Sequence, residues 1–325
     1  MPITQWSNSH ATKYLGAYKC PKDQSAQYRV LKQKCDNFAK VINCSHLTRS
    51  ETACFYWAIY RLSANYVLPS TYFTEDELSK IQGKAHSSMV ERSGYCRTTP
   101  KEIIYGPKQY GGAGYFHLYD DQGYGQVKIF LKVWRSPHTQ LGQLLRVAMA
   151  WCHFSAGTGT SLLLNVQTKL PHLESKWISS LQQFLHQVNG HITLDNTYMQ
   201  PKQRVHDRYI MDLALYCGSK FKPADIKRIN YCRLHLNILL LSNITMPCGS
   251  RLDPAAYKGD KNSLFSSTTN HNIHQPRPRE QTWKPWRRLL TLQCKFTTSA
   301  TCSHPPSKRM EIKCTRPPMA LALLL

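Results

Sequence analysis

Apolar residues recur at helical spacing along most of the chain. Near the start, residues 12–16 (Thr-Lys-Tyr-Leu-Gly) instead predict a short strand that ends in a glycine turn. Residues 25–43 place an apolar side chain at every third or fourth position, which predicts an amphipathic helix. Two more helices begin with the capping-box sequence Thr-x-x-Glu, at Thr48 and at Thr74. Because the connections are short and polar, we expect an antiparallel three-helix bundle within residues 25–100.

A glycine-rich segment separates this bundle from a second helical region. Because residues 105–114 hold four glycines and a proline, we predict a domain hinge over residues 101–114. Helical periods return across residues 115–252, so the second domain is also expected to be helical and the fold class to be mainly α. From residue 253 to 325 the composition predicts a basic, flexible linker and a disordered tail, in which only residues 283–290 could pack. The hinge glycines are Gly106, Gly111, Gly112 and Gly114.

The net charge of the chain limits the functions that it could have. The sequence has 42 Lys and Arg against 19 Asp and Glu, a formal charge of +23, with 42% hydrophobic residues. This balance argues against an ordinary near-neutral enzyme and predicts a polyanionic partner, of which nucleic acid is the commonest. An anionic membrane fits less well, because the basic residues do not line one face of an amphipathic helix. We therefore expect RNA, DNA or an RNA–DNA hybrid as partner, and no membrane.

Two further patterns limit the location and the chemistry. The chain opens without an apolar signal sequence and has no apolar run long enough to cross a membrane, so we expect an intracellular protein, nuclear or cytoplasmic and not secreted. The twelve cysteines show no paired spacing, which predicts free thiols and no metal site.

One short sequence has the composition of a catalytic motif. Leu118-Tyr119-Asp120-Asp121 places two adjacent carboxylates after an aromatic residue, as in the hairpins with which polymerases hold two magnesium ions. However, the residues that follow keep a helical period, whereas such a hairpin lies between two strands. We therefore interpret Asp120 and Asp121 as residues of a helix N-terminus, favoured there by the helix dipole. No catalytic residue is predicted, although a magnesium-dependent polymerase that uses both carboxylates stays open as an alternative.

Several collinear motifs resemble one family. The chain is similar to reverse transcriptases of retrotransposons that lack long terminal repeats, in the region downstream of the catalytic palm, over roughly residues 10–290. In that family a "yLG" hairpin follows the palm, a helical thumb comes next, and a glycine-rich segment opens a helical connector. The matching segments are residues 12–16, Gly94-Tyr-Cys-Arg97, residues 100–107, residues 110–114, residues 170–177, residues 226–233 and residues 283–287.

The resemblance implies an organisation and a function. Residues 1–24 would be the hairpin after a missing palm, residues 25–100 the thumb, and residues 115–252 the connector. The chain would hold the template-primer without catalysing polymerisation, and Mg²⁺ would be required only with the missing palm, so no cofactor is expected here. Possible partners include the rest of the polymerase. The expected phosphate contacts are Lys32, Lys34, Lys40, Arg49, Arg97, Lys101, Lys108, Lys227, Arg228 and Arg233.

Two other functions stay open beside the magnesium-dependent polymerase. The chain could be a non-enzymatic helical interaction protein whose charge is incidental. It could also be the product of a decayed reading frame with no selected role. Tight binding of a partner that nucleic acid does not affect would favour the interaction protein.

Overall fold

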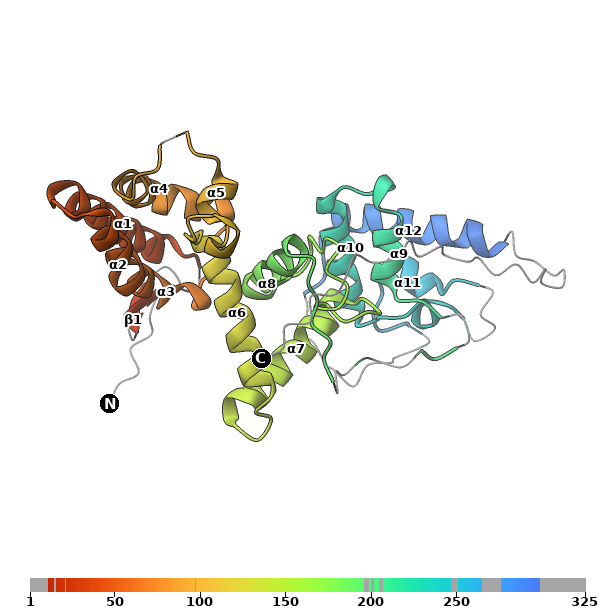
Figure 1. Ribbon diagram of the computed structural model, residues 1–325. Coiled ribbons are helices and arrows are strands. Elements are labelled where there is room, and N and C mark those ends of the chain that lie inside the picture. Colours follow the sequence, from red (N-terminus) through yellow and green to blue (C-terminus); the bar gives the residue numbers. More distant parts are fainter. Residues whose placement is uncertain are drawn as a thin grey trace.

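The fold is mainly helical, as predicted, with one small β-hairpin (Figure 1). The computed structural model describes residues 11–14, 16–20, 22–96, 98–195, 199, 202–204, 207–246, 251–264 and 276–298, with side chains to residue 292. The hairpin joins β1 (Thr12–Tyr14) to the antiparallel β2 (Ala17–Lys19). Gly16 in the turn has φ +82°, a conformation that glycine adopts without strain, so the predicted strand and turn are confirmed.

The three-helix bundle is also confirmed. It consists of α1 (Ser25–Cys44), a second helix in three parts, and α4 (Glu75–Arg92). The second helix runs from α2 (Arg49–Phe55) through the π-helical η1 (Tyr56–Arg61) into α3 (Leu62–Asn65), and the 3₁₀ turn η2 (Leu68–Ser70) leads on to α4. Both capping boxes form, since Thr48 and Thr74 accept from the backbone N–H of Glu51 and Glu77.

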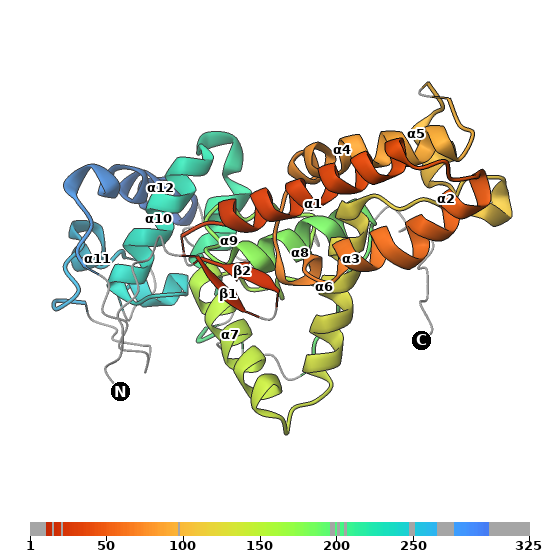
Figure 2. The same ribbon diagram turned by 90° about the vertical axis from the view of Figure 1, so that its left-hand side faces the viewer.

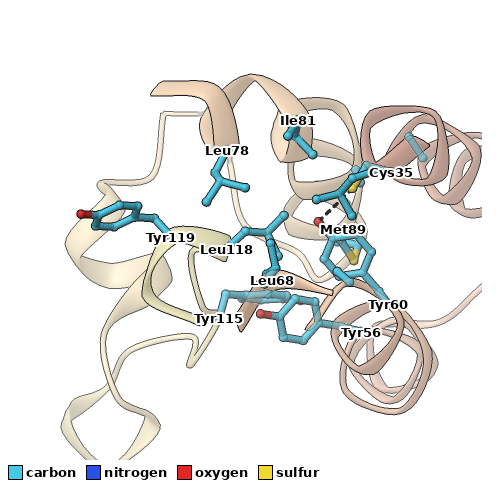
Figure 3. Close-up of a cluster of buried hydrophobic side chains, with 14 of the residues drawn as sticks. Cys35, Tyr56, Tyr60, Leu68, Leu78, Ile81, Met89, Tyr115, Leu118 and Tyr119 are labelled. Carbon is cyan, nitrogen blue, oxygen red and sulfur yellow. Dashed lines mark hydrogen bonds between the residues drawn. The ribbon is translucent and has the colours of Figure 1, made fainter. Parts of the chain in front are cut away.

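A first core lies between these helices and is closed by residues from beyond the bundle. Figure 3 shows Leu78 and Ile81 beside Leu118, and Tyr56 beside Tyr115. The Cys35 thiol lies 3.8 Å from the Tyr60 hydroxyl. Because Tyr115 and Leu118 are buried in this core, the first structural unit extends past residue 114.

The predicted hinge at residues 101–114 is wrong, because the segment folds back on itself. It contains α5 (Lys101–Tyr105) and the 3₁₀ turn η3 (Lys108–Tyr110). The Ala113 N–H donates to the Ile103 carbonyl at 2.8 Å, and the Gly114 N–H donates to the Gly106 carbonyl at 2.9 Å. A Cβ on Gly112 would lie 2.1 Å from the Gly106 carbonyl oxygen. The glycines therefore permit a close backbone crossing in a closed turn.

Helix α6 (Leu118–Trp134) links the first core to a second one. Its first turn lies in the first core, whereas Phe130 and Trp134 pack with α7 (Gln140–Ala156) and α8 (Lys176–Gln187). Figure 2 shows α6 and α7 as a V whose tip projects away from the other helices. The helical prediction for this region is confirmed.

The C-terminal part forms a further core, which corrects the prediction of a flexible segment from residue 253 onward. This core combines α9 (Ile210–Tyr216), α10 (Pro223–Leu236) and α12 (Glu280–Thr298), joined by α11 (Pro254–Lys258) and the 3₁₀ turns η4 (Gly218–Lys220) and η5 (Leu241–Ile244). Trp283 and Trp286 are fully buried. As predicted, residues 283–290 pack. Residues 265–275 of the predicted linker and residues 299–325 of the predicted tail lie outside the described residues.

Candidate nucleic-acid interface

Helices α1 and α4 lie side by side and run in the same direction, which creates a long seam on the surface (Figure 2). The Lys32 ammonium donates to the Lys80 carbonyl at 3.1 Å. Farther along, the Lys84 ammonium lies 4.0 Å from the Asp36 carboxylate. In each of these pairs the α4 residue follows the α1 residue by 48 positions. The two helices therefore stay in register along the seam.

A groove runs along this seam and is lined by small side chains between longer charged ones. Ala39 from α1 and Gly83 and Ser87 from α4 are among the small lining residues, and Lys40 and Lys84 stand beside them. A Cβ built on Gly83 meets no atom within 4 Å. Glycine costs an exposed helix about 1 kcal/mol relative to alanine, and here no internal contact requires it. The glycine instead leaves room for another molecule to approach the helix.

The seam has an excess of positive charge. Its acidic residues are Asp36 and Glu91, whereas the carboxylates of the first turn of α4 lie at the far end of that helix. Arg92 joins the seam at its other end, where its guanidinium donates to the Asn43 carbonyl at 3.2 Å. An elongated surface of this kind suits a phosphate backbone. We define the α1–α4 basic seam by its cationic residues: Lys32, Lys40, Lys80, Lys84 and Arg92.

The other predicted contacts in the first unit point elsewhere. The Lys34 ammonium donates to the Ser63 carbonyl at 2.8 Å, so it lies on the α3 side of α1. Arg49 packs over Gly94, where a Cβ would lie 2.7 Å from its guanidinium carbon. Lys101 and Lys108 are exposed on the closed turn. Of the predicted set, the structure brings only Lys32 and Lys40 together on the basic seam. Arg97 lies outside the described residues.

A second basic groove lies between α10 and α12. Among its lining residues are Arg228, Lys284 and Arg288, with Asp225 as the acidic member. Arg228 pairs with Asp225 at 3.2 Å, which neutralises part of its charge. Lys227, also predicted as a contact, is exposed on α10. The first groove also contains an ion pair, between Lys84 and Asp36 at a longer 4.0 Å, so ion pairing alone does not rank the two grooves. We prefer the α1–α4 basic seam because Lys32, Lys80 and Arg92 extend its positive charge beyond the groove.

The prediction that Arg233 contacts phosphate is wrong, because its side chain is fully buried. The guanidinium donates to the carbonyls of Phe154 at 2.9 Å and Ser155 at 2.8 Å, and to the Asn230 side chain at 2.9 Å. Burial lowers the pKa of Arg233 to about 9. These partners occupy its donors inside the protein, so Arg233 ties α10 to the end of α7 and does not contact phosphate.

Asp120 and Asp121 lie in the first turn of α6, as the helix interpretation predicts. The Arg61 guanidinium donates to the Asp121 carboxylate at 2.7 Å and stacks over the Phe116 ring at 4.0 Å. Burial, with repulsion from Asp121 and Glu75, raises the pKa of Asp120 to about 6. Within the described residues, no three His, Cys, Asp or Glu side chains form a group that could hold a metal ion. Asp121 thus has a structural partner.

The sequence interpretation missed three cations of the basic seam: Lys80, Lys84 and Arg92. Their spacing could have revealed them, because they follow one another at multiples of four residues in the helix predicted to begin at Thr74. What the sequence did not reveal is the pairing of α1 with α4, which places these cations beside Lys32 and Lys40. That pairing depends on the tertiary fold.

Comparison with protein-family models, with curated proteins and with solved structures finds no match to this chain. The resemblance to reverse transcriptases therefore depends on the sequence motifs alone. In the described part of the chain, no helix combines the length and the apolar character needed to cross a membrane.

Proposed function

We propose that this chain is the non-catalytic C-terminal part of a retrotransposon reverse transcriptase, an RNA-directed DNA polymerase, and that it holds the template-primer duplex on the α1–α4 basic seam. The observation that carries the proposal is the row of five cations along the seam between two parallel helices, against two carboxylates, Asp36 and Glu91, in its groove. Lys40 and Lys84 line that groove, and Lys32 and Arg92 extend the seam on either side. The sequence motifs of the family support the same assignment.

The dimensions of the seam suit a duplex. From Lys80 to Arg92 the helix rises about 18 Å, at about 1.5 Å per residue. A double helix carries roughly one phosphate charge per 1.7 Å of its axis, so about ten phosphates pass along this length. Each lysine that neutralises a phosphate releases a counterion, which gives affinity without reading the sequence. Backbone recognition of this kind is what a polymerase needs to hold every template.

The proposed binding also requires that the sugar-phosphate backbone can come close to the helices. The small side chains at Ala39, Gly83 and Ser87 leave the centre of the groove low, while Lys40 and Lys84 are long enough to reach over it. A sugar-phosphate backbone seated there would touch the helix surface at Gly83. The proposal therefore includes a steric requirement at this glycine as well as a charge requirement.

The chemical step belongs to another part of the polymerase in this proposal. Asp121 is paired with Arg61, and half-buried Asp120 lies beside it on the first turn of α6. The carboxylates that hold Mg²⁺ would come from the palm.

Binding of a short RNA–DNA hybrid, titrated against salt concentration, tests the function. With three to five phosphate contacts, the logarithm of the association constant should fall by roughly 2.7 to 4.5 for each tenfold rise in salt. An affinity that does not change with salt rejects the proposal. The competing polymerase function is tested separately by primer extension with Mg²⁺, where activity of the wild type that is lost in a folded Asp121→Ala variant would overturn the non-catalytic assignment.

A further inference from the structure

Helix α7 turns an apolar face outward. Four large apolar side chains on it are substantially exposed: Leu141 (61%), Leu144 (65%), Val147 (68%) and Trp151 (45%). They lie on one side of the helix with exposed Ala148 between them, while Met149 and Ala156 on the other side are buried in the second core. A soluble helix normally shows the reverse pattern. The described residues leave this face uncovered.

The face is also almost free of charge. Between Arg135 and Lys169 the only Asp, Glu, Lys or Arg is Arg146. Its guanidinium turns inward, where it donates to the Trp134 carbonyl at 3.1 Å and lies 4.3 Å from the centre of that indole. The neighbouring helix α6, in contrast, exposes Lys128 and Lys132. In a chain of charge +23, the α7 face is a surface on which another copy meets no like charge at close contact.

We infer that this face binds a second copy of the same chain, with the two α7 helices packed antiparallel about a two-fold axis. Leu141, Leu144, Ala148 and Trp151 follow the 3-4-3 spacing of a coiled-coil seam, which suits a helix as partner better than a flat surface. The occupant must itself be apolar and uncharged along the contact. The α7 face of another copy meets both requirements.

The residue sizes are complementary when one helix is reversed. With the axis at position 146, Leu141 of one copy faces Trp151 of the other, and Leu144 faces Ala148. Each large side chain at Leu144 thus meets a small one, and the same contacts occur twice, as an isologous interface requires. Antiparallel helices also place opposite dipole ends together. The projecting position of the α6–α7 hairpin keeps this face accessible to a second molecule (Figure 2).

Salt should affect self-association of the chain and its binding to nucleic acid in opposite directions. Two copies of charge +23 repel each other at long range, and added salt screens that repulsion. Self-association should therefore strengthen as salt rises, whereas nucleic-acid binding weakens. Because the two salt dependences have opposite signs, self-association and nucleic-acid binding can be measured separately. The absence of a dimer would therefore leave the proposed function untouched.

Sedimentation velocity on the full chain, freed of nucleic acid by nuclease and high salt, tests the inference. The contact is small, so we expect a monomer–dimer equilibrium between about 1 and 100 μM, stronger at high salt. Leu144→Asp places a carboxylate in the contact and should weaken association at least tenfold. Because Leu144 is exposed, this change leaves the fold intact, which circular dichroism can verify.

Ile129→Asp is the matched control, because Ile129 is exposed on the adjacent α6 and lies outside the apolar face of α7. This variant should dimerise like the wild type. A wild type that is monomeric at every concentration overturns the inference, as does a dimer that Leu144→Asp leaves unchanged. A monomer that binds vesicles of zwitterionic phosphatidylcholine, which have no net charge, through Leu144 would assign the face to lipid and would also overturn the inference.

Discussion

The guanidinium of Arg61 donates to the carboxylate of Asp121 at 2.7 Å, joining the π-helical segment η1 to the first turn of α6. The Tyr56 hydroxyl, also from η1, accepts from the Phe116 N–H at 2.8 Å. These contacts fix the start of α6 against the bundle. The Tyr-Asp-Asp sequence therefore has a structural explanation, and the segment before α6 is held in place where a hinge was expected.

Replacing Asp121 should weaken folding and leave nucleic-acid binding unchanged. In Asp121→Ala the Arg61 guanidinium, about a quarter exposed, loses its ionic partner, and we expect a loss of about 3 kcal/mol in the free energy of unfolding. Urea denaturation measures this loss. Because the basic seam lies elsewhere, the affinity of the folded variant for an RNA–DNA hybrid should equal that of the wild type. A stable variant with lost affinity would contradict this account.

Asp120→Asn should stabilise the protein at neutral pH. Burial, Asp121 and Glu75 raise the pKa of Asp120 to about 6, so the folded state holds its proton to a higher pH than the unfolded chain does. Ionisation therefore costs stability as pH rises from about 4 to 6, and the cost persists above pH 6. After allowance for solvent screening, Asn should recover about 1 kcal/mol at pH 7.5. Thermal unfolding should show no gain at pH 4; an equal gain at both pH values would contradict the assignment.

His86 should make the protein sensitive to acid. Burial, with the positive charges of His117 and Lys101, lowers its pKa to about 4. As pH falls from about 6.5 to 4, the unfolded chain takes up the proton first, so stability is lost across this range, by about 2 kcal/mol at pH 5. In His86→Leu the decline should be shallower by that amount. The control is His138→Leu, at an exposed site between α6 and α7, and the histidine assignment fails if both variants show the same pH dependence.

Two glycines distinguish a closed turn from a hinge. Gly112→Ala forces a Cβ to within 2.1 Å of the Gly106 carbonyl, so the turn must open, at a cost of about 2 kcal/mol or more. Gly111 has φ +83° but no atom within 4 Å of its Cβ position, so Gly111→Ala should cost only about 1 kcal/mol. Chemical denaturation of both variants measures the difference. A flexible hinge would tolerate the two substitutions equally.

The parts of the fold that sequence predicted are those decided locally. The capping boxes at Thr48 and Thr74 and the glycine turn at Gly16 depend on residues a few positions apart, and each is present. Glycine content, however, does not distinguish a flexible joint from a tight crossing, because both need a missing side chain. The closed turn depends on Ala113 meeting Ile103, which composition does not reveal.

The candidate site was predictable only in part, for a related reason. Arginine is usually exposed, so Arg233 was expected to contact phosphate, yet its donors meet carbonyls that come from almost eighty residues earlier in the chain. Lys32 and Lys40 were found because they lie on the polar side of a recognisable helix. Their companions on α4 become part of the same surface only when the two helices pair.

The most direct test of the basic seam compares two double variants of equal charge change. Lys40→Glu with Lys84→Glu alters the groove, and Lys128→Glu with Lys132→Glu alters the exposed side of α6. The measurement is the affinity for an RNA–DNA hybrid as a function of salt. We predict that the groove pair lowers affinity at least tenfold at low salt and reduces the salt slope by about 2, whereas the α6 pair keeps the wild-type slope. Equal losses in both variants would mean that net charge alone attracts nucleic acid, and would contradict a binding site between α1 and α4.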